Sequence, residues 1–365
     1  MEDNPKPNIN PNQPQQDRRK RARIGDVFVL DKLISKERMR EVLQEQRTTK
    51  RKLGEILLEK GYVTKQELKD VVAKQNLANG RWQKLVQTIS VIFSNSYLNT
   101  VSAKSIYVGP GKGYCVPFLH CYACPTSVGS CPIGNLQHFS GIRAIPYYTL
   151  GFIGLIGVTT GRMACGWLCP FGFLQDLMFK IKSKKIRIPQ YFKYLKYFFL
   201  VAFVFILPYT TGIKWFSQIC PNGGLIAGIP WVLWNPISPV TGNPTIPVGS
   251  VNLFFWLKMA ILLFFLVMFV KSKRPFCRTM CPMGALLSLF NPVSLLNMEV
   301  IETTCGTCNL CREVCPVDIK IYDNPKSMEC IRCLHCTACP SVKFKLASFK
   351  TPCQAPGVKP VNSVK

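Results

Sequence analysis

Eight of the 18 cysteines fall in two runs near the C-terminus, CGTCNLCREVCP from residue 305 and CIRCLHCTACP from residue 330. The first run has the spacing C-x2-C-x2-C-x3-C-P, in which thiolates hold [4Fe–4S] cubes and the fourth cysteine serves the cube of the other run. The runs therefore predict two cubes. One is held by Cys305, Cys308, Cys311 and Cys339, and the other by Cys330, Cys333, Cys336 and Cys315.

Zinc is the alternative metal for these runs. A structural zinc ion needs four tetrahedral ligands, but it does not need two interlocked runs that both end in Cys-Pro. The second run departs from the usual spacing, because only two residues separate Cys336 from Cys339. The geometry of Cys339 as a ligand is therefore the least determined part of this prediction.

A second cysteine pattern repeats along the middle of the chain. The hexad C-P-x-G-x-L begins at residues 131, 169, 220 and 281, and two copies extend to R-x-x-C-x3-C-P-x-G from Arg162 and Arg274. Proline is favoured in the first turn of a helix, whose dipole stabilises a thiolate just before it. We expect two pairs of metal ligands, which converge if the two halves pack with pseudo-twofold symmetry. The pairs are Cys165 with Cys169 and Cys277 with Cys281.

The two arginines would offset part of the charge of these four thiolates. The plainer interpretation is that the four cysteines are small apolar residues at tight helix starts. Four further cysteines are candidates for an additional metal or cluster on the opposite side, where a disulfide is the competing prediction. They are Cys121, Cys124, Cys131 and Cys220, with Cys115 nearby. Cys353 is expected to be a free thiol in a C-terminal tail.

Four uncharged or nearly uncharged stretches are expected to position these motifs as membrane-spanning helices. They are residues 85–103, the weakest of the four, and 144–161, 197–213 and 251–270. Their lengths fit the 17 to 25 residues or so that cross a bilayer, and Lys258 can extend toward an interface. Lysine and arginine follow the second and fourth stretches, which predicts a multi-pass inner-membrane protein with both termini and the cysteine runs on the cytoplasmic side.

A tandem repeat precedes the membrane section. The copies start at Arg23 and Lys52, 29 residues apart, and each reads as helix, turn, helix, with Ser35 and Thr64 as N-caps and Glu67 completing a capping box. The bland interpretation is a small docking module. The copies also resemble the N-terminal domain of type II secretion and pilus ATPases, some of which bind cyclic di-GMP. That resemblance implies nucleotide contacts from Arg23, Ile24, Gly25, Gln46, Lys52, Leu53, Gly54 and Gln75.

The CGWLCP and CRTMCP elements, followed by the paired runs, resemble the NapH/NosR-like membrane polyferredoxins over about residues 82–345. The resemblance implies electron transfer between the membrane quinone pool, or an outer redox partner, and cytoplasmic carriers. Metal trafficking for a respiratory oxidoreductase is the alternative. The tandem repeat is not a general part of this family, and cyclic di-GMP acting through it would add regulation.

The composition agrees with a membrane protein rich in metal ligands. Hydrophobic residues make up 48% of the chain, and the net charge of +27 lies largely beside apolar stretches, which argues against nucleic acid. No cleavable signal peptide, Walker A motif or nucleophile–base pattern is found, so an electron-transfer subunit is expected rather than a stand-alone enzyme.

The predicted fold is multi-domain and mostly α-helical, with about four spans and an α+β ferredoxin-like module. Its parts are a disordered basic tail (1–22), a helical repeat domain (23–80), a membrane domain (81–298), a ferredoxin-like domain (299–342) and a flexible tail (343–365).

Overall fold

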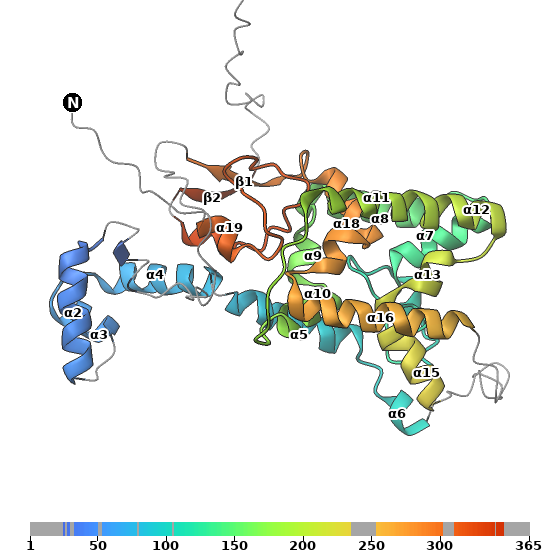
Figure 1. Ribbon diagram of the computed structural model, residues 1–365, viewed down its shortest axis with the longest axis horizontal. Coiled ribbons are helices and arrows are strands. Elements are labelled where there is room, and N and C mark those ends of the chain that lie inside the picture. The colour runs from blue at the N-terminus through green and yellow to red at the C-terminus, as the bar shows by residue number, and fades with distance from the viewer. Residues whose placement is uncertain are drawn as a thin grey trace, which may run out of the picture. The chain divides into compact units, whose positions relative to one another are not determined.

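The computed structural model describes residues 25, 28–29, 33–49, 53–78, 80–103, 106–234, 253–301, 310–339 and 341–346. The chain divides into two compact units, residues 1–79 and 80–365 (Figure 1). The predicted tail over residues 1–22 lies outside the described residues, as do Cys305, Cys308 and Cys353.

In the first unit, helices α2 (Lys36–Thr49), α3 (Leu53–Glu59) and α4 (Lys65–Ala78) enclose a small apolar core. The repeat is visible in the packing. A methyl group built on Gly25 would lie 3.3 Å from the Met39 sulfur, and one built on Gly54 would lie 3.2 Å from Leu68. The second pair lies 29 positions after the first, so both copies of the repeat pack a glycine against a long apolar side chain.

The two predicted N-caps of this unit are confirmed. The amide of Glu67 donates to Thr64 Oγ1 at 3.3 Å, and the amide of Thr64 donates to the Glu67 carboxylate at 2.8 Å. The amide of Arg38 donates to Ser35 Oγ at 3.3 Å in the other copy. These bonds satisfy amides that the first turn of a helix leaves unpaired.

The second unit is mostly helical, and its elements follow one another in an order that repeats. The first half contains α5 (Arg81–Ser94), α6 (Asn99–Ala103), η1 (Pro110–Gly113), α7 (Pro132–Gly141), α8 (Tyr147–Thr160), α9 (Met163–Trp167) and α10 (Pro170–Met178). The second half contains η2 (Gln190–Tyr194), α11 (Leu195–Phe198), η3 (Phe199–Ile206), α12 (Leu207–Thr211), α13 (Trp215–Ile219), α14 (Pro221–Gly223), η4 (Gly224–Gly228), α15 (Ile229–Trp234), α16 (Leu253–Lys271), α17 (Pro275–Thr279) and α18 (Pro282–Phe290).

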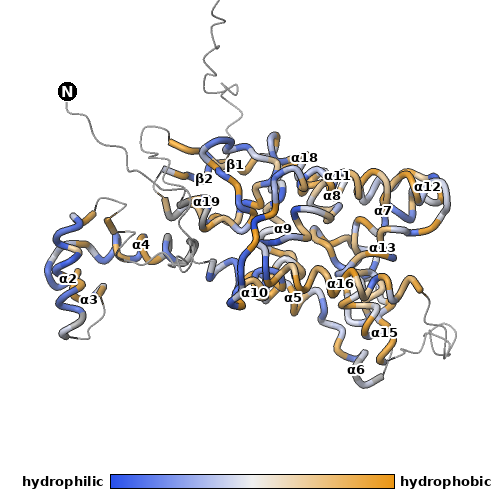
Figure 2. The backbone as a smooth tube through the Cα atoms, in the orientation of Figure 1, coloured by the Kyte–Doolittle hydropathy of each residue, from blue (hydrophilic) through white to orange (hydrophobic). Residues whose placement is uncertain are grey.

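Among the described residues, two helical segments are long and apolar enough to cross a membrane, Gln190–Thr211 and α16. The other two predicted spans are shorter, because α8 and α5 each have 14 residues. Figure 2 shows α16 as mostly hydrophobic, and its Leu263 and Phe264 are 64% and 58% exposed.

Helix α5 buries its polar face and exposes its apolar one. Gln83, Gln87 and Ser90 are buried and donate to the carbonyls of Gly166 and Leu168. The opposite face carries exposed Ile and Phe side chains, among which Phe93 is 77% exposed. A water-soluble helix shows the reverse pattern.

The C-terminal part of this unit holds a two-stranded antiparallel sheet of β1 (Leu296–Val300) and β2 (Val342–Leu346), with α19 (Leu310–Val314) and η6 (His335–Ala338) beside it. Strand β2 continues four residues past 342, where the ferredoxin-like domain was predicted to end. Lys343 and Lys345 are exposed, so residues 343–346 resemble a polar tail in sequence. Their backbone nevertheless pairs with β1.

Candidate iron–sulfur centre

All four hexads adopt the same local structure. In each copy the cysteine is the N-cap and the proline is the first residue of a helix, at the starts of α7, α10, α14 and α18. The Sγ atom of Cys169 accepts the Gly172 amide at 3.4 Å, and that of Cys281 accepts the Gly284 amide at 3.4 Å. The two extended hexads thus aim a helix-terminal N–H group at sulfur, an arrangement that favours a thiolate, whereas the N-caps Cys131 and Cys220 make no such bond.

The two extended hexads pack against each other with crossed arginines. Arg162 Nη2 donates to the Cys277 carbonyl at 3.4 Å, and Arg274 Nη1 donates to the Cys165 carbonyl at 3.1 Å. Each guanidinium also covers the hexad glycine of the other half, because a methyl group on Gly172 would lie 3.4 Å from Arg274. The equivalent methyl on Gly284 would lie 3.2 Å from Arg162. The packing therefore follows the pseudo-twofold relation expected from the duplication.

This packing brings the four cysteines of the extended hexads together, and we call them the inner quartet: Cys165, Cys169, Cys277 and Cys281. All four are buried, and each interacts electrostatically with at least one other member. Gln175 Nε2 donates to the Cys277 sulfur at 3.2 Å. Burial, followed by the nearby Cys277 and Cys165, raises the pKa of the Cys169 thiol to about 12, so a metal must displace protons to bind.

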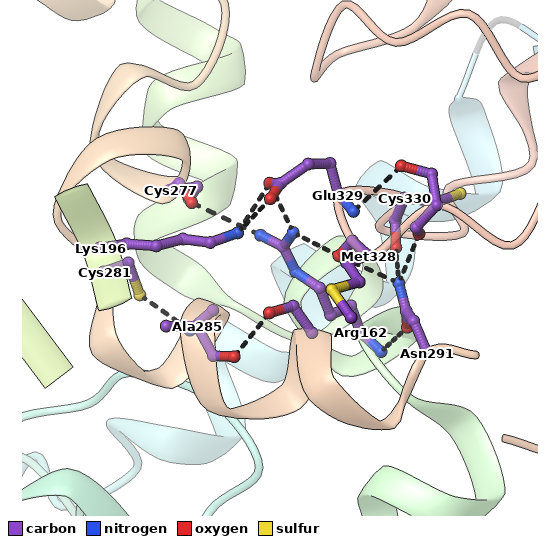
Figure 3. A network of polar contacts seen from close by, with 12 residues as sticks. Arg162, Lys196, Cys277, Cys281, Ala285, Asn291, Met328, Glu329 and Cys330 are labelled. Carbon is purple, nitrogen blue, oxygen red and sulfur yellow. Dashed lines mark hydrogen bonds and ion pairs between the residues drawn. The ribbon is translucent and has the colours of Figure 1, made fainter. Parts of the chain in front are cut away.

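Buried charges surround the inner quartet. Arg162 and Lys196 are fully buried, and both bind the Glu329 carboxylate, at 3.0 Å and 2.6 Å respectively. Figure 3 shows the two cations converging on Glu329 beside Cys277. Burial alone would raise the pKa of Glu329, but Arg162 and Lys196 outweigh that effect and hold it below its usual value.

Arg274 forms the matching contact in the other half. Its Nε donates to Asp176 Oδ1 at 2.8 Å, and its Nη2 binds the other carboxylate oxygen. Arg274 has φ +40°, a left-handed conformation that a non-glycine residue adopts only when surrounding contacts hold it. From the sequence, Lys196 and Arg274 were counted among the basic residues that set membrane topology, and Arg274 was also expected to offset thiolate charge. The structure buries both side chains beside the cysteines.

Five of the predicted ferredoxin cysteines line one small cavity in the C-terminal part of the unit. They are Cys311, Cys315, Cys330, Cys333 and Cys336. The set predicted for one cube is contained in this group, including Cys315, which comes from the other run. Cys339 directly follows η6 and packs against the same apolar core as Cys311, Cys330 and Cys336. Cys305 and Cys308 lie outside the described residues.

The inner quartet and the ferredoxin loop are in direct contact through Gly166. This glycine lies between Cys165 and Cys169, and a methyl group built on it would lie 2.4 Å from the Ile331 carbonyl oxygen. Ile331 lies between Cys330 and Cys333, and the neighbouring Trp167 Nε1 donates to the Arg332 carbonyl at 3.0 Å. Backbones carrying cysteines of both sites therefore touch.

The four buried thiols of the inner quartet have the chemistry of an iron–sulfur ligand set. Among the described residues, no three His, Cys, Asp or Glu side chains lie close enough together to hold one metal ion. Thiolates on a cube each bind a different iron, so they stand further apart than thiolates sharing one ion. Three buried cations face two carboxylates around the quartet, and the remaining positive charge suits a four-thiolate cube, whose net charge is about −2 in its common oxidised state.

The cysteines of the outer side do not form one group. All five are free thiols in the structure, and the disulfide that competes with a metal site in the sequence-based prediction is not among its contacts. Cys121, Cys131 and Cys220 interact with one another. Cys124 contacts Thr126 at 3.2 Å, and Cys115 accepts a hydrogen bond from Asn135 at 3.2 Å.

The residues predicted to contact cyclic di-GMP have structural roles where they are described. Leu53 is buried in the core of the first unit, and Gly25 and Gly54 pack against side chains. Gln46 and Gln75 are half-buried, while Arg23, Ile24 and Lys52 lie outside the described residues. Nucleotide binding here stays a prediction.

Sequence reasoning missed several residues of the inner site, namely Gln175, Asp176, Lys196, Asn291 and Glu329. Three of them had a signal in their position: Gln175 and Asp176 follow Cys169 on its own helix, and Glu329 directly precedes Cys330. Asn291 Oδ1 accepts the Arg162 amide at 2.9 Å, and its Nδ2 donates to the Cys330 carbonyl at 2.8 Å.

A family model described as a 4Fe-4S binding domain matches residues 148–189 and 252–297. These are the two halves that carry the inner quartet, not the C-terminal runs. An uncharacterized protein of Methanocaldococcus jannaschii is 32% identical over 61% of this chain and 87% of its own length. No solved structure matches.

Named relatives share the same region. The regulatory protein NosR of Stutzerimonas stutzeri is 28% identical over 47% of this chain and 22% of its own length. The ferredoxin-type protein NapH of Haemophilus influenzae is 25% identical over 52% of this chain and 64% of its own. The duplicated cysteine halves and these likenesses define an iron–sulfur protein of the electron-transfer class. The chain belongs to the NapH/NosR-like family of ferredoxin-type proteins.

Proposed function

We propose that the chain is a membrane-bound electron relay with one cube at the inner quartet and two in the ferredoxin-like module. Electrons would pass between the quartet and the module, then to a soluble carrier on the cytoplasmic side. The other end of the relay would be the quinone pool or an outer redox partner. The contact between Gly166 and Ile331 carries the proposal, because it joins the two cysteine sites through adjacent backbone.

Membrane attachment is supported by the exposed apolar surface. The apolar faces of α5 and α16 and the segment Gln190–Thr211 need a hydrocarbon environment that water does not provide. The polar face of α5 holds the carbonyls of Gly166 and Leu168, so this helix anchors the quartet to the membrane section.

The chain's own residues would set the properties of the quartet cluster. The amides of Gly172 and Gly284, together with Gln175 Nε2, donate to sulfur and would stabilise the reduced cluster. Arg162 and Arg274 would offset the added negative charge of that state. Bound iron–sulfur clusters would supply the one-electron chemistry.

Iron and sulfide analysis of the anaerobically purified full chain tests the proposal. The double variant Cys169→Ser, Cys281→Ser should lose about four irons per chain, while the reducible [4Fe–4S] EPR signals of the module persist. Cys115→Ser is a matched control, since Cys115 is equally buried but bonded to Asn135. A double variant with unchanged iron content, or a wild type without reducible [4Fe–4S] signals, would contradict the relay.

A further inference from the structure

A second cysteine site lies toward the other end of α16, away from the inner quartet. Helix α14 packs on the first part of α16, because a methyl group built on Gly223 would lie 3.9 Å from Lys258 Nζ. Helices α10 and α17 pack nearer its end, where Phe171 lies against Phe269 and Phe276 against Phe265. Lys258 and Lys271 on this helix are separated by 13 residues of sequence, or about 20 Å of helix. The hexads beginning at Cys131 and Cys220 therefore mark a site distinct from the quartet.

Three cysteines meet at this second site, and we call them the outer triad: Cys121, Cys131 and Cys220. A methyl group built on Gly223 would lie 3.5 Å from the Cys121 sulfur, 3.8 Å from Cys220 Cβ and 3.9 Å from Lys258 Nζ. One point therefore has two cysteines and an ammonium group around it. Cys131 interacts electrostatically with both other thiols.

The third cysteine is brought in by a loop that other elements hold in place. Asn222 Nδ2 donates to the Leu119 carbonyl at 3.1 Å, Trp231 Nε1 to the Ala123 carbonyl at 2.6 Å, and Lys112 Nζ to the Tyr122 carbonyl at 2.8 Å. These bonds fix the backbone on both sides of Cys121. The loop therefore holds Cys121 beside Gly223 and Cys220.

The surroundings of the triad resemble those of the inner quartet in chemical kind. Backbone amides of the hexads face the sulfurs of Cys131 and Cys220, and a cation, Lys258, interacts with Cys121 and Cys220. Lys258 was expected to extend toward a membrane interface, whereas its amine lies beside the cysteines. Cys124 and Cys115 contact polar side chains instead.

From this geometry we propose that the outer triad holds a [4Fe–4S] cluster with three protein thiolates, leaving one iron for an exchangeable ligand. The proposal rests on the relay function only in that the chain binds iron–sulfur clusters. It adds a fourth cluster, toward the opposite end of the membrane section from the ferredoxin-like module.

Oxidation gives the triad a distinctive test. A cube with one iron lacking a protein thiolate loses that iron as Fe²⁺ after one-electron oxidation by ferricyanide and leaves a [3Fe–4S] cluster, which has its own EPR signal. The full-length wild type should give this signal. The variant Cys121→Ser, Cys131→Ser, Cys220→Ser should lack it and contain about four fewer irons.

Cys115→Ser, Cys124→Ser is the matched control and should keep both the signal and the iron. The single variant Cys131→Ser guards against misfolding, because persistent EPR signals from the module would show that the chain is intact. Unchanged iron in the triple variant would overturn the proposal. A disulfide within the triad of the isolated protein, or zinc or copper bound there instead of iron, would also overturn it. These outcomes leave the quartet and its own test untouched.

Discussion

The inner quartet and the outer triad are both built on pairs of hexads, and each is completed in a different way. The quartet takes its remaining cysteines from the extension R-x-x-C, so both halves contribute equally and their arginines cross. The triad lacks that extension, and an unrepeated loop supplies Cys121. The hexad glycines show the same contrast. Those of the quartet leave space for an arginine, whereas a methyl group built on Gly134 would lie 2.9 Å from the Tyr122 ring.

This difference suggests how a duplicated element can serve two roles. The hexad supplies one cysteine at a helix start and one glycine that leaves space above it. The group that packs over the glycine then determines the charge and symmetry of the cysteine site. A guanidinium from the partner half gives a symmetric, strongly charged pocket, while a loop from outside the repeat gives an asymmetric one.

The sharpest test of the contrast is the substitution Glu329→Gln. It removes the carboxylate between two buried cations, Arg162 and Lys196, and breaking a buried ion pair costs about 3–5 kcal/mol. We expect that loss in the free energy of unfolding, together with weaker iron binding at the quartet. Iron bound at the triad should be unaffected.

The matched control is Glu299→Gln, because Glu299 pairs with Lys345 in an exposed position. Its expected cost is about 0–1 kcal/mol. Denaturant unfolding of the solubilised chain measures both variants. Equal costs for the two would mean that the buried network does not hold the inner site together.

A smaller effect is expected from Gly166→Ala. The added methyl would lie 2.4 Å from the Ile331 carbonyl oxygen, so backbone must move, at a cost of about 1–3 kcal/mol. The quartet should then separate from the ferredoxin loop, and the magnetic interaction between their reduced clusters should weaken in EPR spectra. Gly154→Ala is the control, since a methyl there meets nothing within 4 Å.

The pH dependence of stability should come from the inner site in particular. A carboxyl with a lowered folded pKa binds fewer protons when folded, so the stability it adds is present above the unfolded pKa of about 4.3. That stability is lost as the pH falls through the lower folded pKa of Glu329. We expect the melting temperature of wild type to fall below pH 5 more steeply than that of Glu329→Gln. Parallel curves would contradict a lowered pKa for Glu329.

The cysteine pairs of the quartet could be predicted from the sequence because spacing and duplication are local patterns. Its charge network could not. Glu329 and Arg162 are separated by 167 residues, and nothing in the sequence says that a lone glutamate before Cys330 faces a buried lysine from a membrane helix. The ion pair of Lys196 could not be predicted either, because basic residues beside an apolar stretch look the same whether they face lipid headgroups or a buried carboxylate.

The helices show the same division. Capping residues in the repeat were predicted correctly since an N-cap depends on three or four neighbouring residues. Two of the four expected spans are shorter than a bilayer, because uncharged residues in 85–103 and 144–161 belong partly to turns. Apolar composition alone does not reveal where a helix ends.

The smallest effect on stability, and the most selective one, is expected from Gly134→Ala. The new methyl would lie 2.9 Å from the Tyr122 ring, and alanine favours the helix by about 1 kcal/mol, which offsets much of the crowding. The net change in stability should be about 1 kcal/mol or less. Displacement of Tyr122 should nevertheless move the adjacent Cys121 and lower the iron content of the outer triad.

Gly284→Ala is the inner counterpart, because its methyl would meet the end of the buried Arg162 side chain at 3.2 Å rather than a ring. A guanidinium can yield by a few tenths of an ångström, so quartet iron should stay bound. Iron and sulfide analysis of both variants, beside the ferricyanide-induced EPR signal, separates the two sites. The prediction is that the loop carrying Cys121 is more easily disturbed than the crossed arginines. It would be contradicted if Gly284→Ala lost the iron of the quartet while Gly134→Ala kept the iron of the triad.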